Sequence, residues 1–316
     1  MPAEFENGFF VRKPAWHGLG TVLPDYVERE EAFRLSGQDW TVEKQQLLRV
    51  TTEWGTRVAV PGHFAAVRSD NAGLLGIHQD SYEVLQNTEG WDLAEAVADQ
   101  DQAVQYETGI TLKGGRVCAI LLRDQPFTIG GDDSPTVPYT LISWAHDGSA
   151  AMTVHATNVR VVCSNTLSLA LKGGTQRFSF RHTKNVRDRI EKATAAISQM
   201  RTNTELYRNL ANSLAKEPID TAQLGSFTTA LFPDAEPHTP QAQHKQLGKR
   251  AKVINLVRSS RTIPDDLRFT KYGLLQAGVE YLDWSRNSRS DENRFARTYL
   301  AAEPEKARLL ELVVGA

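Results

Sequence analysis

The sequence predicts an α+β fold: an antiparallel meander sheet covered by helices, followed by a long helix and a helical C-terminal region. Two observations support this class. Between residues 104 and 163, β-branched apolar runs alternate with short turns, which is typical of antiparallel strands. From residue 184 to 216, apolar residues recur at spacings of three and four, which is typical of a helix. Strands come first and helices last, as in an α+β chain.

The first 100 residues predict short elements of both kinds. In the acidic segment 92–101, the apolar residues are spaced as on one face of a helix. The other expected elements are a compact turn at Trp16–Gly20, a helix near Glu28–Ser36, strands near Thr41–Val50 and Thr56–Val60, and a hairpin over His63–Arg68 and Leu74–His78.

The clearest local prediction is a hairpin with strands Val104–Leu112 and Val117–Arg123. Lys113-Gly114-Gly115-Arg116 joins them, and a Gly-Gly pair suits a tight turn. A long polar connection is expected over Pro126–Pro138. After it we expect a third strand at Tyr139–Ala145, a second tight turn at His146–Ser149, and one or two return strands within Ala151–Cys163.

The stretch Arg160–Leu171, RVVCSNTLSLAL, changes character at Cys163. Before this residue the run is β-branched, whereas Ser164 and Asn165 are good helix N-caps and leucines follow them. We therefore predict a strand-to-helix corner in which Ser164 or Asn165 caps the helix and Cys163 is packed.

The C-terminal half predicts helices separated by a linker. Residues 232–245 hold three prolines and show no periodicity. The expected parts are an α+β core over 1–182, a long helix and its connection over 183–231, a linker over 232–245, and a helical region over 246–316. Along the long helix, a narrow apolar seam from Val186 to Leu214 suits packing against a second subunit. Packing against the chain's own helices at 246–259 or 272–284 explains the seam nearly as well.

Composition describes an ordinary soluble chain. It has 316 residues, 41% hydrophobic and 23% charged, with a net charge of −2. No apolar run reaches the roughly 18–20 residues that span a bilayer, and the N-terminal residues do not resemble a signal peptide. Two cysteines, Cys118 and Cys163, make no disulfide framework. We expect a cytoplasmic protein with no membrane partner.

Charge is segregated along the chain. Residues 79–107 contain eight acids and no Lys or Arg, whereas residues 245–261 contain six bases and no acid. Residues 172–201 contain eight bases and two acids. This asymmetry indicates a polyanionic partner, although solvated basic helix faces are also common.

The sequence offers little for catalysis. Cys163 follows an apolar strand, where a free thiol is usually buried, and His146-Asp147 is already explained by a tight turn. The histidines show no zinc spacing, and no glycine-rich stretch matches a nucleotide-binding loop. We therefore expect no enzyme, no cofactor and no metal.

The remaining chemistry is that of single-stranded nucleic-acid binding, in which basic side chains contact phosphates and aromatic rings stack on bases. The alternative is that the aromatic residues face the core and the bases are solvated. The expected DNA-binding residues are Lys113, Arg116, Arg160, Lys172, Arg177, Arg181, Lys184 and Arg187, with Phe178 and Phe180 as stacking candidates.

Four motifs resemble one family. They are Trp16-His17-Gly18-Leu19-Gly20, His146-Asp147-Gly148-Ser149, Arg160–Leu167 (RVVCSNTL) and Arg181-His182-Thr183. They are similar to the phage- and plasmid-related proteins that share domain of unknown function 932, over roughly residues 8–312. The resemblance implies a mobile-element protein that acts inside a bacterium, and it brings no established activity.

The expected order of hairpin, further strands and basic helix also resembles phage single-strand annealing proteins of the RecT, Red-beta and Erf class. That resemblance implies ATP-independent DNA annealing by a homo-oligomer in recombination. The alternative function is a non-catalytic protein-interaction factor, for example an inhibitor of a host defence, that uses the acidic residues 79–107.

Overall fold

The computed structural model confirms the α+β class. It describes residues 4–12, 19–51, 55–98, 104–160, 165–167, 177–180, 202, 204–234, 239–288 and 304–315. Contacts divide the chain into two compact units, which we call the first and second unit. The first unit comprises residues 1–124, 139–156 and 177–199, and the second comprises 125–138, 157–176 and 200–316.

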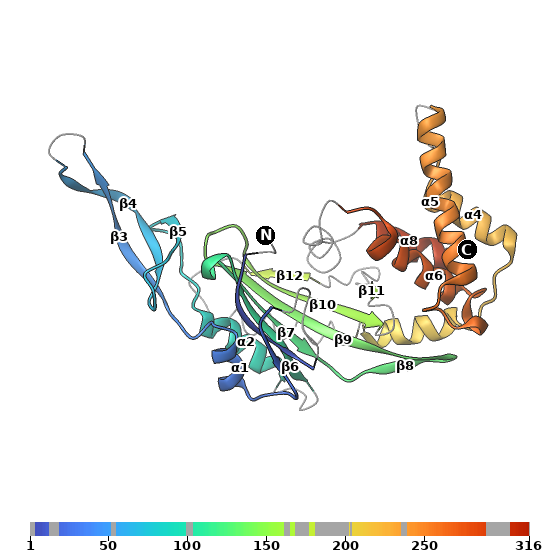
Figure 1. Ribbon diagram of the computed structural model, residues 1–316, viewed down its shortest axis with the longest axis horizontal. Coiled ribbons are helices and arrows are strands. Elements are labelled where there is room, and N and C mark those ends of the chain that lie inside the picture. The colour runs from blue at the N-terminus through green and yellow to red at the C-terminus, as the bar shows by residue number, and fades with distance from the viewer. Residues whose placement is uncertain are drawn as a thin grey trace. The chain divides into compact units, whose positions relative to one another are not determined.

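A large, mostly antiparallel sheet confirms the predicted meander (Figure 1). Its order is β11-β10-β9-β7-β6-β1-β2, with β12 paired to β10 and β8 paired to β9. The predicted hairpin is β6–β7, with Leu112 opposite Val117. The strands are β1 Phe5–Val11, β2 Thr21–Leu23, β6 Gln105–Leu112, β7 Val117–Arg123, β8 Phe127–Ile129, β9 Asp132–Ala145, β10 Met152–Arg160, β11 Asn165–Leu167 and β12 Arg177–Phe180.

Two predictions along this sheet were wrong. The polar connection expected over Pro126–Pro138 is a hairpin, because β8 pairs with the start of β9 across Gly130-Gly131. The helix expected after Asn165 does not begin there: Asn165–Leu167 is strand β11, antiparallel to Asn158–Arg160 of β10. Backbone hydrogen bonds to β10 therefore outweigh the local capping and leucine signals. Cys163 and Ser164 lie outside the described residues.

Helices α1 (Arg29–Leu35) and α2 (Asn87–Ala98) lie close together beside the sheet of the first unit (Figure 1). The helix expected in the acidic segment is α2, and it buries the indole of Trp91 completely. A Cβ at Gly90 would lie 2.5 Å from the ring of Trp144, so the helix can approach β9 only with glycine at this position.

A second, three-stranded antiparallel sheet has the order β3-β4-β5. Its strands are β3 Val42–Val50, β4 Arg57–Arg68 and β5 Leu74–Gln79, so the two short strands expected between residues 56 and 68 are one long strand. Residues 64–68 of β4 are buried, whereas Leu74 and Ile77 of β5 are 50% and 54% exposed.

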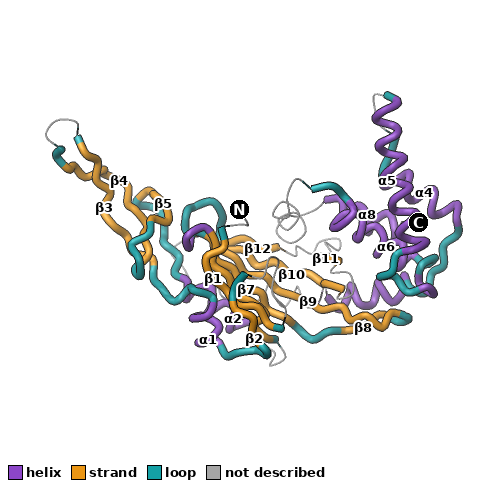
Figure 2. Tube along the Cα trace, in the orientation of Figure 1, coloured by secondary structure: helices purple, strands orange, loops and turns teal. Residues whose placement is uncertain are grey.

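The second unit consists mainly of helices (Figure 2). Its apolar core joins Tyr207 and Leu214 of the helix over residues 204–214 to buried residues of the later helices. The described end of the predicted seam thus packs within the chain, and residues 186–201 lie outside the described residues. The other helices are α4 Thr221–Leu231, α5 Pro240–Ser259, α6 Lys271–Glu280, a π-helical turn Tyr281–Ser285, and α8 Pro304–Gly315.

Helix α5 begins earlier than expected. Thr239 caps it by accepting the backbone N–H of Ala242 at 3.2 Å, and Pro240 occupies the first turn. Proline is well tolerated there because the first backbone N–H groups of a helix have no internal partner. The prolines that predicted a linker to residue 245 therefore include one that starts a helix.

Candidate nucleic-acid interface

The turn between β6 and β7 adopts a left-handed conformation. Lys113, Gly114 and Gly115 have φ values of 54°, 68° and 88°. This region is open to glycine but costs a residue with a Cβ roughly 1–2 kcal/mol. The turn is held from outside: Lys113 N–H donates to the Glu4 carbonyl at 2.8 Å, and the Arg116 carbonyl accepts from His146 N–H at 2.8 Å.

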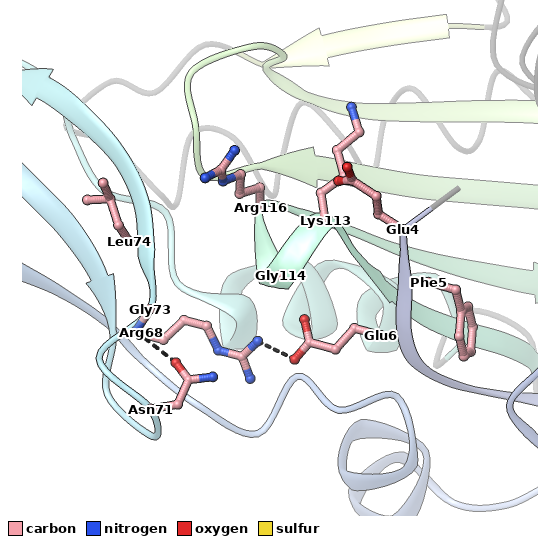
Figure 3. A pocket seen from close by; sticks show the side chains of 10 residues that line it. All are labelled: Glu4, Phe5, Glu6, Arg68, Asn71, Gly73, Leu74, Lys113, Gly114 and Arg116. Carbon is pink, nitrogen blue, oxygen red and sulfur yellow. Dashed lines mark hydrogen bonds and ion pairs between the residues drawn. The ribbon is translucent and has the colours of Figure 1, made fainter. Parts of the chain in front are cut away.

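This turn forms one wall of an open pocket of about 500 Å³. Lys113 and Arg116 are exposed, and neither forms an ion pair with an acid among the described residues. Figure 3 shows both side chains leaving the turn on the side away from the Arg68–Glu6 pair. The lining residues are Glu4, Phe5, Glu6, Arg68, Asn71, Gly73, Leu74, Lys113, Gly114 and Arg116.

Arg68, which sequence reasoning missed, supports the turn from below. Its side chain is 5% exposed and pairs with Glu6 Oε1 at 2.5 Å and Asp70 Oδ2 at 2.7 Å. The guanidinium also lies 4.4 Å from the ring centroid of Trp40. The hydrogen bonds that Arg68 donates lower the pKa of Asp70 below its ordinary value. Because its charge is balanced in this way, Arg68 serves to position the turn.

The other predicted DNA-binding residues are only partly located. Arg160 lies at the end of β10, and Arg177, Phe178 and Phe180 lie in β12, which pairs with β10. The side chains of these four residues lie outside the description, as do Lys172, Arg181, Lys184 and Arg187 altogether. The structure thus brings together Lys113 and Arg116, and the rest of the proposed track stays a prediction.

The second tight turn is fixed by Asn87, also missed from the sequence. Asn87 Nδ2 donates to the carbonyl oxygens of Gln38 and Trp40 at 2.9 and 3.2 Å, which leaves its Oδ1 as an acceptor. That oxygen accepts from Trp144 Nε1 at 3.1 Å and from His146 Nε2 at 2.8 Å. The imidazole of His146 is 2% exposed and therefore belongs to a buried structural network.

Asp147 does not orient the His146 imidazole. Its carboxylate accepts the backbone N–H of Ser149 at 2.9 Å, which closes the turn. Burial raises the pKa of the Cys118 thiol, which favours the unreactive protonated form. Within the described ranges, no cluster of three or more His, Cys, Asp or Glu residues is arranged to hold a metal ion, and no helix is long and apolar enough to cross a membrane.

Comparison with known proteins gives one result. No curated protein and no solved structure matches the chain. A family model described as Domain of unknown function (DUF932) matches residues 74–301, which include the Lys113–Arg116 turn, the His146–Ser149 turn and helix α5. Because the match covers more than half of the chain, this protein belongs to the DUF932 family.

Proposed function

We propose that this protein binds single-stranded DNA and anneals complementary strands without ATP, in recombination for a phage or another mobile element. The proposal is supported mainly by the exposed basic side chains of the Lys113–Arg116 turn. Lys113 and Arg116 are exposed beside an open pocket, and neither is paired with a described acid. Exposed cations on a rigid turn suit the phosphates of a passing strand, since phosphate contacts dominate nucleic-acid affinity.

The two side chains offer complementary phosphate chemistry. The planar guanidinium of Arg116 can bind two phosphate oxygens at once, while the ammonium of Lys113 acts as a point charge. Each phosphate contact on a single strand contributes about 0.7 to the slope of log K against log salt. The turn alone therefore accounts for a slope of about 1.4.

The Arg68–Glu6 pair, rather than Glu4, defines the side on which a strand can pass, because Figure 3 draws the Glu4 carboxylate on the same side of the turn as the Lys113 side chain. Glu4 and Glu6 also line the pocket, and the Glu6 carboxylate is bound by Arg68. A phosphodiester strand is therefore expected on the side toward which Lys113 and Arg116 project (Figure 3). The other candidates for phosphate contacts remain those predicted from the sequence, namely Arg160, Lys172, Arg177, Arg181, Lys184 and Arg187.

Annealing also requires assembly, because two complementary strands must be held near each other. We propose a homo-oligomer in which residues 186–200 of the seam contact a second copy. Light scattering at micromolar concentration, with and without DNA, checks this step. A species of 35.2 kDa under both conditions contradicts it.

The test of function is direct. Fluorescence anisotropy with a labelled single-stranded oligonucleotide should show binding at about 50 mM salt that weakens steeply toward 200 mM. A quenched-oligonucleotide assay without ATP should show faster annealing as protein is added. Absence of binding at about 50 mM salt rejects the proposal, since phosphate-driven affinity is highest there.

The second candidate is a non-catalytic protein-interaction factor, such as an inhibitor of a host defence. The exposed Leu74 and Ile77 on β5 favour it. The acidic segment favours it less, because Asp92 and Glu95 of α2 already contact Arg29. Ile77→Ser separates the two functions: DNA affinity stays unchanged if the turn is the binding site, whereas capture of a protein partner by β5 is lost.

A further inference from the structure

Three lysines line one side of helix α5, and we call Lys245, Lys249 and Lys252 the lysine stripe. Their spacing of four and three residues places them within about 60° of one another around the helix, along about 10 Å of its length. Lys245 and Lys252 are exposed and Lys249 is half-buried, while Val253 and Val257 bury the adjacent face. The N-terminal half of α5, which carries Lys245 and Lys249, extends beyond the neighbouring helices (Figure 1).

The charge of the stripe is only partly balanced within the described residues, where Glu305 is the acid that acts on Lys249. Helix α5 contains no acid. Its Arg250 pairs with Asp234 at 2.7 Å, but the three lysines form no ion pair with a described acid. Lys249 lies 5.5 Å from the ring centroid of Phe232.

Positive charges repel one another around Lys249. Burial, and then the nearby charges of Lys245 and Arg286, lower the pKa of Lys249. Arg286 is itself paired with Glu305 at 3.0 Å, so part of the positive charge is compensated there. An anion beside the stripe would relieve the remaining repulsion, because lysines four residues apart on a helix otherwise destabilise each other.

An open pocket of about 390 Å³ continues the stripe toward the C-terminal end of α5. Ser260 is committed to Glu280, to which its hydroxyl donates at 2.8 Å. On the helix side, the Ser259 hydroxyl donates to the Asn255 carbonyl oxygen at 2.8 Å, so the ammonium of Lys252 and the amide of Asn255 are the remaining side-chain donors. The pocket is lined by Lys252, Asn255, Leu256, Ser259, Ser260 and Ser285.

We propose that the lysine stripe and this pocket bind successive phosphates of a nucleic-acid strand, as a contact surface of the second unit separate from the turn of the first. The inference rests on the proposed function and adds its second binding element. The occupant follows from charge complementarity: an acid-free helix with unpaired lysines matches a regular polyanion, and regular helical spacing reads no base sequence.

The test replaces all three stripe lysines with glutamine (Lys245→Gln, Lys249→Gln, Lys252→Gln), which keeps helix propensity. A matched control removes the same charge from the second unit at exposed positions outside the stripe (Lys216→Gln, Arg258→Gln, Arg261→Gln). Circular dichroism checks that both variants unfold at or above the wild-type temperature. Affinity for a labelled oligothymidine is then measured between about 50 and 200 mM salt.

Loss of three phosphate contacts lowers the slope of log K against log salt by about 2. Between about 50 and 200 mM salt, the fold-loss of affinity should therefore be about twenty times smaller for the stripe variant than for wild type. The control keeps a slope closer to that of wild type. A stripe variant whose slope matches that of the control overturns the inference, whatever happens at the turn.

Unfolding in the presence of inorganic polyphosphate tests the phosphate site independently of DNA binding. Polyphosphate should raise the unfolding temperature of wild type and of the control, and raise that of the stripe variant less. If DNA fails to bind wild type while this difference persists, the proposed function fails and the phosphate site stands. If neither polyanion distinguishes the stripe variant from its control, the lysines are a solvated face or a protein contact and the inference is wrong.

Discussion

The two basic surfaces of this protein are built by opposite means. The turn at Lys113–Arg116 depends on left-handed backbone, two glycines and a buried arginine that arrives from β4. The lysine stripe depends on the period of one helix and on little else. A charge on a turn is therefore sensitive to distant substitutions, whereas a charge on a helix tolerates them. Single changes should separate these two kinds of support.

Each unit also contains a buried cation with a different kind of partner. Arg68 in the first unit and Lys306 in the second are both 5% exposed. The carboxylates of Glu6 and Asp70 are 32% and 43% exposed, whereas that of Asp283 is 1% exposed. Removal of Arg68 therefore leaves two carboxylates that water can reach, whereas removal of Lys306 leaves a carboxylate that is shielded from water.

The largest expected effect is therefore in the second unit. Lys306→Met removes the ammonium that lies 2.6 Å from Oδ1 of the buried Asp283, and should destabilise the unit by about 3–5 kcal/mol. Arg68→Met should cost the first unit about 1–3 kcal/mol, because water can reach its partners. Denaturant unfolding measures both. Equal losses would contradict the role assigned to partner burial.

The next effect tests the packing beneath the turn. A Cβ at Gly115 would lie 2.9 Å from both Arg68 Nη1 and Trp40 Cζ2, and φ is 88°, so Gly115→Ala should cost about 2–4 kcal/mol. Gly114→Ala is the matched control: its φ is 68°, but nothing lies within 4 Å, so about 1–2 kcal/mol is expected. If thermal unfolding shows the same loss in both, the packing against Arg68 is not what restricts the turn.

Helix α5 should respond in the opposite direction. A Cβ at Gly248 meets nothing within 4 Å, and alanine restrains the unfolded chain more than glycine does. Gly248→Ala should stabilise the second unit by about 0.5–1 kcal/mol and leave DNA affinity unchanged. A lower midpoint in denaturant would mean that α5 is not the regular helix on which the stripe depends.

The smallest effect concerns a carboxyl group of the first unit. Burial raises the pKa of Glu107, although Tyr26 donates a hydrogen bond to it at 3.2 Å. The protonated form is thus favoured by folding, and its stability contribution is present below the unfolded pKa and lost as pH rises through the folded value. Glu107→Gln should slightly raise the melting temperature at pH 7, and this gain should vanish near pH 4. A gain that persists at pH 4 would point to another cause.

Local signals predicted the centre of the fold and missed pairings between distant segments. The β6–β7 hairpin followed from its own residues, since strand alternation and a Gly-Gly turn lie within 20 residues. Strand β1 was not expected, because Phe5–Val11 gains its partner from β6, about 100 residues later. Asn165–Leu167 has the local chemistry of a helix start, yet its backbone pairs with β10.

The site shows the same division. Lys113 and Arg116 were predicted because a hairpin turn exposes its charges wherever the hairpin lies. The pocket beside them was not, because it needs Glu4, Arg68 and Asn71 from other strands and turns. The hydrogen-bond network of Asn87, Gln38 and Trp40 forms only when three segments of the chain meet. No spacing in the sequence predicts it.

DNA binding at the turn is tested most directly by the salt dependence of single-stranded DNA affinity in the double variant Lys113→Gln with Arg116→Gln. Arg34→Gln with Arg49→Gln removes the same charge from exposed positions elsewhere on the first unit. If the turn binds DNA, the turn variant lowers the slope of log K against log salt by about 1.4 and the control changes it less. A turn variant whose slope equals that of the control would contradict DNA binding at the turn.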